Sequence, residues 1–165
     1  MGMIGNLIRV SQARLDEYLA DSSLLESDIY TDGDPNPNLV DIDKTWDGIL
    51  FLLTGSNSQD SSHPLARILF SGNLIDGKQD IGYGPAHYLS PEEVKELNDQ
   101  ISTITADDLR QKYDAAKMEE MGVYPNVWKR DEEMGFRYLS DYFGDIQQVF
   151  AKAAQNGEAI ITFIN

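Results

Sequence analysis

Short apolar runs rich in β-branched residues lie near both ends of the chain. One covers Met3 to Val10 and the other covers Ala159 to Ile164. β-branched and aromatic residues favour strands, and runs this short fit a strand better than a helix. We therefore expect each end of the chain to contribute a strand, and we expect these two strands to share one sheet.

Between these runs, apolar residues recur at intervals of three and four, which is the spacing of a buried helical face. One such face consists of Trp46, Ile49, Leu50 and Leu53. Gly55 follows it, and glycine suits the left-handed position after the last turn of a helix. Turn-forming residues precede this helix, because Thr31 to Asn38 contains two prolines among Asp, Asn and Gly.

Four further helices are expected from start and stop signals. Ser90 with Glu93 forms a capping box, and Thr105 with Asp108 is a similar start whose helix should continue to Gly122. A last helix should begin near Asp131 and end at Asn156-Gly157. A first helix should follow Ser11, whose hydroxyl suits a capping position.

These elements predict the α+β class. Residues 1–165 should form one compact domain, with a small sheet that includes the N- and C-terminal strands and packs with several helices.

Composition then narrows the possible functions. The 165 residues include 28 acidic and 13 basic ones, and the net charge is −15. Nucleic-acid binding and binding to anionic lipid both need a basic face, so neither is expected. The chain has no cysteine, and its apolar runs fall far short of the roughly 20 residues that span a bilayer. We expect a cytoplasmic protein that needs no metal and no cofactor.

Several phrases of the sequence occur together in a known order. They are MGMIG at the start and the segments Val40–Gly55, Pro64–Gly72, Gly82–Leu97 and Gly122–Trp128. In this order and spacing the chain resembles the YfbM-like family of small bacterial proteins. The resemblance implies a compact single α+β domain. It implies no activity, so no catalytic residue can be transferred.

The turn-rich segment that begins at Thr31 partly matches the pattern of an EF-hand calcium-binding loop. Oxygen-bearing side chains occupy every second position from 32 to 38, namely Asp32, Asp34, Asn36 and Asn38. Asp43 is at the twelfth position counted from Asp32. An EF-hand needs glycine at the sixth position, where this chain has proline, and glutamate at the twelfth. We therefore expect a solvated turn and no metal site.

The phrase Asp-Ile-Asp-Lys-x-Trp-Asp supplies a second candidate. Polar groups at the start of a helix can hold an anion. The simpler interpretation needs no ligand: Asp43 caps a helix beginning at Lys44, Trp46 is part of the core, and Lys44 pairs with acidic neighbours.

Two histidines could act as bases near neutral pH. His63 lies in a polar loop, and His87 follows a glycine-rich turn that contains Tyr83. Each also has a structural interpretation, His87 as a satisfied core or edge residue. One hypothesis is a small-molecule-binding or enzymatic site that combines the glycine-rich turn with the segment from Asp41 to Asp47. The residues of this site would be Asp41, Asp43, Lys44, Trp46, Tyr83 and His87.

Charge supplies the competing hypothesis. From Asp16 to Asp47 there are ten acidic residues and one basic residue, Lys44. Such a field attracts and steers a basic partner. Because no motif specifies a reaction, we favour a non-enzymatic interaction domain that binds a basic protein, with an immunity-like inhibitor of a basic toxin as one form. The partner-binding residues would include Asp28, Asp32 and Asp34.

Overall fold

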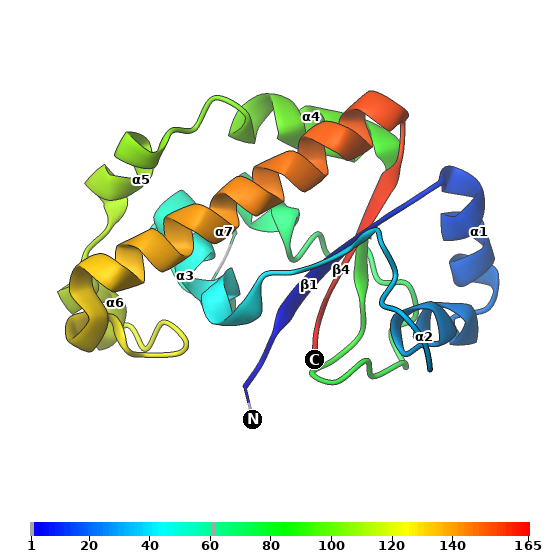
Figure 1. The fold of residues 1–165 in the computed structure, drawn as a ribbon, viewed down its shortest axis with the longest axis horizontal. Helices are drawn as coiled ribbons and strands as arrows, with labels where there is room; N and C mark the ends of the chain where they lie inside the picture. The colour runs from blue at the N-terminus through cyan, green and yellow to red at the C-terminus, as the bar shows by residue number, and fades with distance from the viewer. Residues whose placement is uncertain (1, 61) are drawn as a thin grey trace.

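The two terminal strands form the centre of a four-stranded antiparallel sheet. The structure, a computed structural model, describes residues 2–60 and 62–165. Strand β1 (Gly5–Val10) pairs with β4 (Ala159–Ile164), so that Gly5 lies opposite Ile164 and both chain ends lie at the same end of the molecule (Figure 1). The short strands β2 (Leu39–Asp41) and β3 (His87–Leu89) form the edges, in the order β2-β1-β4-β3. The predicted α+β class and the shared sheet are confirmed.

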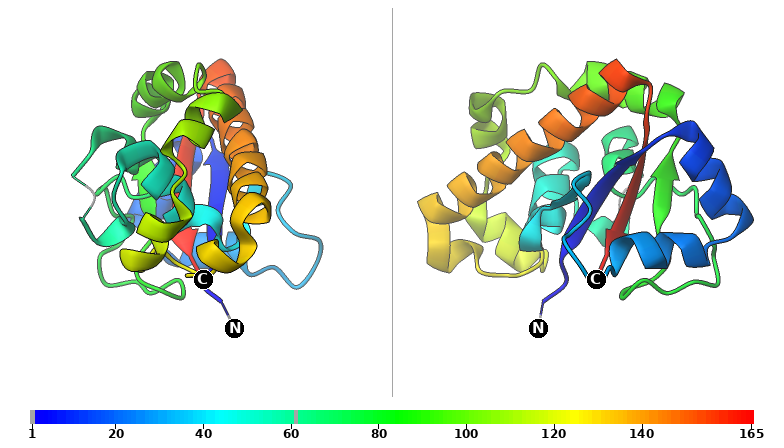
Figure 2. Two further views of the ribbon diagram at one scale, coloured as in Figure 1. Left: turned by 90° about the vertical axis from the view of Figure 1, so that its left-hand side faces the viewer. Right: turned by 45° about the vertical axis from the view of Figure 1, so that its right-hand side comes forward.

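Helices cover both faces of this sheet (Figure 2). Helices α1 (Gln12–Ala20) and α2 (Ser23–Ile29) pack on one face over Ile8 and Ile161. The opposite face carries Leu7 and Ile160, and its helices are α3 (Trp46–Thr54), α4 (Pro91–Ile101), α5 (Ala106–Lys112), α6 (Ala115–Glu120) and α7 (Trp128–Asn156). Within the described residues, three short 3-10 helices connect these elements, namely η1 (Asp43–Thr45), η2 (Ser58–Asp60) and η3 (Pro64–Ile68).

Burial on both faces explains the composition of β4. Side chains alternate between the two faces of a strand, and every residue from Ala159 to Ile164 is buried. A nearly continuous apolar run, as in this strand with its single polar residue Thr162, is the expected sequence for burial on both faces.

The predicted helix starts are confirmed where a side chain caps the backbone. The hydroxyl of Ser11 accepts from the Arg14 amide, and both capping boxes form, at Ser90 and at Thr105. These bonds join residues three apart, so the local sequence is enough to specify them.

Two predicted boundaries are wrong. The expected helix from Thr105 to Gly122 is two helices, because Tyr113 is extended and Asp114 caps α6 through the Lys117 amide. Helix α7 begins at Trp128, before Asp131, and its backbone is kinked at Glu132. Within residues 2–60 and 62–165, no helix combines the length and the apolar character needed to cross a membrane.

Candidate functional site

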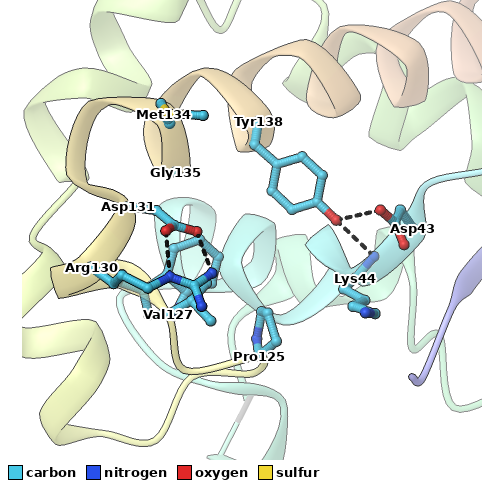
Figure 3. Close-up of a pocket in the computed structure, with 10 residues that line it drawn as sticks. Asp43, Lys44, Pro125, Val127, Arg130, Asp131, Met134, Gly135 and Tyr138 are labelled. Carbon is cyan, nitrogen blue, oxygen red and sulfur yellow. Dashed lines mark hydrogen bonds and ion pairs between the residues drawn. The ribbon is translucent and has the colours of Figure 1, made fainter. Parts of the chain in front are cut away.

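A cavity of about 500 Å³ lies where α7 begins, between its first turns, the preceding loop and η1 (Figure 3). We call it the Tyr138 cavity. It is lined by Asp43, Lys44, Pro125, Val127, Trp128, Arg130, Asp131, Met134, Gly135 and Tyr138.

Three phrases that are far apart in the sequence meet beside this cavity. The Met3 amide donates to the hydroxyl of Tyr124 at 2.9 Å, and the indole of Trp46 donates to the Met3 carbonyl at 3.0 Å. The rings of Trp46 and Tyr124 stack with centroids 5.4 Å apart. One packed unit therefore forms from three segments, which are the MGMIG start, Asp41–Asp47 and Gly122–Trp128.

Close approach explains two glycines of that start. A Cβ atom on Gly2 would lie 2.3 Å from Cε of Lys44, and one on Gly5 would lie 2.9 Å from Cγ1 of Ile42. Both distances are shorter than carbon atoms tolerate without displacement. Glycine therefore lets the N-terminal segment lie directly against the residues around η1.

Asp47 fixes the loop that precedes α7. The residue is only 4% exposed, and its carboxylate accepts hydrogen bonds from the amides of Ser58 at 2.7 Å and Tyr124 at 2.9 Å. A buried carboxylate must have such donors, so this side chain has a structural role at the border of the cavity.

Asp43 does not cap the helix, so that prediction is wrong. No side chain caps η1 or α3, and Asp43 adopts a φ of 51°. Its carboxylate instead accepts from the hydroxyl of Tyr138 at 2.7 Å, and that hydroxyl accepts from the Lys44 amide at 3.1 Å (Figure 3). Burial and the Asp43 charge raise the pKa of Tyr138, which therefore stays a neutral hydrogen-bond donor.

Strained backbone is concentrated around this cavity. In the described part of the chain, three non-glycine residues have a positive φ, namely Asp43 (51°), Asn126 (64°) and Glu132 (39°). Asp43 lines the cavity, and the other two lie directly beside lining residues. Such conformations cost free energy and often occur at functional sites.

The charged groups of the cavity differ in their pairing. The guanidinium group of Arg130 donates to both carboxylate oxygens of Asp131, at 2.7 and 3.0 Å. This pairing lowers the pKa of Asp131. Lys44 was expected to pair with acidic neighbours. Among the residues that the structure describes, it makes no ion pair within 4.0 Å. Its ammonium group therefore has no ion-pair partner among these residues.

The other predicted ligand-binding residues lie elsewhere. Asp41 is exposed at the end of β2 and accepts from the Asp43 amide at 2.6 Å, while Trp46 is buried in the core as expected. Tyr83 and His87 do not line the Tyr138 cavity. His87 belongs to β3, at the opposite edge of the sheet from β2.

His87 has a structural environment. Its Nδ1 accepts from the Gly72 amide at 3.1 Å, and its ring meets Phe70 edge to face. Burial lowers the pKa of His87. His63 is exposed, and its Nδ1 caps η3 by accepting from the Leu65 amide.

The predicted partner-binding residues divide into two kinds. Asp28 accepts from the guanidinium of Arg14 at 2.8 Å and from the Tyr18 hydroxyl, so its charge is compensated. Asp32 and Asp34 are exposed in the loop between α2 and β2. No group of three or more His, Cys, Asp or Glu side chains that could hold a metal is found among the described residues.

Sequence reasoning missed the residues that α7 and its preceding loop contribute, chiefly Tyr138, Val127 and Met134. The Gly122–Trp128 phrase carries the family resemblance but no recognisable binding motif. Tyr138 had no local signal, because it lies on α7 among residues that alternate between core and solvent.

Comparison with known proteins is consistent with this fold. The sequence profile of a family described as "Domain of unknown function (DUF1877)" matches residues 1–163. Protein YfbM of Escherichia coli K12 is 25% identical over 142 residues, which are 85% of this chain and 83% of that protein. The crystal structure of the Escherichia coli protein YfbM, whose function is unknown, superposes with a TM-score of 0.77 at 20% identity. That superposition covers 98% of this chain and 99% of the other.

Proposed function

The chain belongs to the family described as a domain of unknown function (DUF1877), and we propose that it is a non-enzymatic domain that binds a small ligand in the Tyr138 cavity. The observation that carries the proposal is that an unpaired lysine and a hydrogen-bonded Tyr–Asp pair line one cavity, and that all three positive-φ non-glycine residues of the described chain lie in its lining or directly beside it.

Size and lining support ligand binding. Small-molecule sites usually measure roughly 300–1,000 Å³, are largely apolar, and carry a few polar groups that orient the ligand. The Tyr138 cavity holds about 500 Å³. Pro125, Val127 and Met134 provide apolar walls, while Asp43 and Lys44 provide charge.

The polar groups suit recognition better than proton transfer. A general base must lose its proton near the working pH. The raised pKa of Tyr138 keeps its proton on the phenol, which is held between Asp43 and the Lys44 amide. This arrangement fixes the position of Asp43, as a binding site requires.

Blocking the cavity tests the proposal. Met134 is 76% exposed at the cavity, so Met134→Trp should fold and fill the space with an indole. Leu19→Trp is the matched control, since Leu19 is 42% exposed on α1, which packs on the other face of the sheet. In a ligand-observed NMR screen of a fragment library, fragments should bind the wild type and L19W, and M134W should lose them. Equal binding to all three proteins, or none to the wild type, would refute the proposal.

A second candidate function is binding of a basic protein, in the cytoplasm and with an immunity-like inhibitor as one form. The exposed carboxylates of Asp32 and Asp34 favour it, since their loop projects from the body of the domain (Figure 2). Asp28 contributes little because Arg14 compensates it. The double variant Asp32→Lys/Asp34→Lys should lose a basic partner captured from lysate at low salt, while Asp99→Lys, exposed on α4, should retain it. Capture that is unaffected by the double reversal would exclude this candidate.

A further inference from the structure

We infer that the ligand of the Tyr138 cavity is a zwitterion of the α-amino acid class with an apolar side chain. This inference rests on the proposed function and deepens it by naming the class of ligand. Its basis is a cation and an anion on consecutive residues, beside an apolar wall.

Lys44 supplies the site for a carboxylate. Its side chain lines the cavity, and no carboxylate of the described residues lies within 4.0 Å of its ammonium group. The N-terminal segment holds the end of the side chain in place, since Cε of Lys44 lies against Gly2. A positioned and unpaired ammonium group is a strong donor to an incoming carboxylate.

Asp43 supplies the site for an ammonium group. Tyr138 donates to one carboxylate oxygen, Oδ2, which leaves Oδ1 without a side-chain or backbone donor among the described residues. Asp43 and Lys44 also make no ion pair with each other, so neither charge satisfies the other. An α-amino acid carries the two complementary charges on groups attached to one carbon atom.

Long-range electrostatics favour a ligand without net charge. The chain has a net charge of −15, so a purely anionic ligand approaches against the field of the protein. A purely cationic ligand leaves Lys44 uncompensated in a partly desolvated cavity. A zwitterion satisfies both groups and meets no net repulsion.

The rest of the cavity suits an apolar side chain. Pro125 lies between the charged end at Lys44 and the Arg130–Asp131 pair, while Val127 and Met134 line the cavity on the side of that pair (Figure 3). That pair neutralises itself, so it offers no further unpaired charge. Burying an apolar side chain against these residues contributes roughly 25 cal/mol per Å².

Calorimetric titration with the full chain tests the ligand class. The probes are L-valine, L-leucine, L-methionine and L-phenylalanine, followed by two analogues of the amino acid that binds most tightly. The N-acetyl analogue lacks the ammonium group, and the amide analogue lacks the carboxylate. We expect at least one amino acid to bind and each analogue to bind roughly tenfold or more weakly, because each loses a charge-assisted hydrogen bond.

Two variants assign the charges to residues. Asp43→Asn keeps an acceptor for Tyr138 and tolerates the positive φ, and Lys44→Met keeps most of the aliphatic chain. Each should weaken amino-acid binding roughly tenfold or more. Asp99→Asn and Lys95→Met are matched controls at exposed positions of α4, and they should bind like the wild type.

The outcomes separate this inference from the proposed function. Amino acids that fail to bind while fragments bind the cavity would overturn the zwitterion and leave the binding function standing. An N-acetyl or amide analogue that binds as tightly as its parent amino acid would also overturn the zwitterion and leave the binding function standing. If neither amino acids nor fragments bind, both proposals are wrong.

Discussion

The phenol of Tyr138 donates a hydrogen bond of 2.7 Å to the carboxylate of Asp43, 95 positions earlier in the chain. The same oxygen accepts from the Lys44 amide, so one side chain of α7 holds two residues of η1. This contact joins the two halves of the cavity and keeps Asp43 in its positive-φ conformation.

Removing that hydroxyl should lower stability. We expect Tyr138→Phe to reduce the free energy of unfolding by about 1–3 kcal/mol, because it leaves the Asp43 carboxylate and the Lys44 amide without a partner. Urea denaturation measures the change. Tyr142→Phe is the control, since Tyr142 packs against Tyr138 through its ring and makes no hydrogen bond in the described chain. Equal losses in the two variants would show that the contact contributes nothing specific.

The backbone at residue 43 makes a separate prediction. Asp43 has a φ of 51°, which costs a residue with an ordinary side chain about 1–2 kcal/mol and glycine almost nothing. Asp43→Ala and Asp43→Gly both lose the bond to Tyr138. We therefore expect Asp43→Ala to melt lower than Asp43→Gly, with Asp43→Asn the most stable of the three. Identical melting temperatures for the alanine and glycine variants would argue against strain at this position.

Two glycines in helices should respond oppositely to alanine. A Cβ on Gly48 would lie 2.7 Å from Leu139 and 2.8 Å from Trp128, so Gly48→Ala should overpack the core and cost about 1–3 kcal/mol. A Cβ on Gly144, in α7, would meet nothing within 4 Å, so Gly144→Ala should stabilise the protein by about 0.5–1 kcal/mol. Thermal unfolding of both variants decides the matter, and a stabilising change at Gly48 would contradict the packing.

Acid should weaken the fold through His87. Burial lowers the pKa of His87 below the ordinary value of 6.5, so the unfolded chain binds the proton more readily than the folded one. Its contribution to stability is therefore complete above the unfolded pKa and is lost as the pH falls below that value. We expect His87→Asn, whose amide oxygen can still accept from the Gly72 amide, to flatten the decline in unfolding free energy between about pH 7.5 and about pH 5.

The exposed His63 provides the control for that experiment. His63→Asn should change the decline less than His87→Asn does, because the side chain of His63 is exposed and that of His87 is partly buried. If His87→Asn follows the wild-type curve as closely as His63→Asn does, the proton uptake resides on other groups.

Much of the fold could be predicted from the sequence because its determinants are local. Ser11, Ser90 and Thr105 cap helices through amides three residues away, and the nearly continuous apolar run of β4 reflects burial on both of its faces. Periodicity and caps act over a few residues, so they can be recognised without knowledge of the partner elements.

The site depended on contacts that sequence spacing does not encode. Asp43 has the residue type of a cap, yet Tyr138 on α7 determines where its carboxylate points, and Asp28 is compensated by Arg14 on α1. The sequence by itself determined the capped helix starts, the terminal strands and the acidic character of the chain. The tertiary structure alone decided which charges are paired and which face a cavity, because electrostatic pairing depends on distance in space.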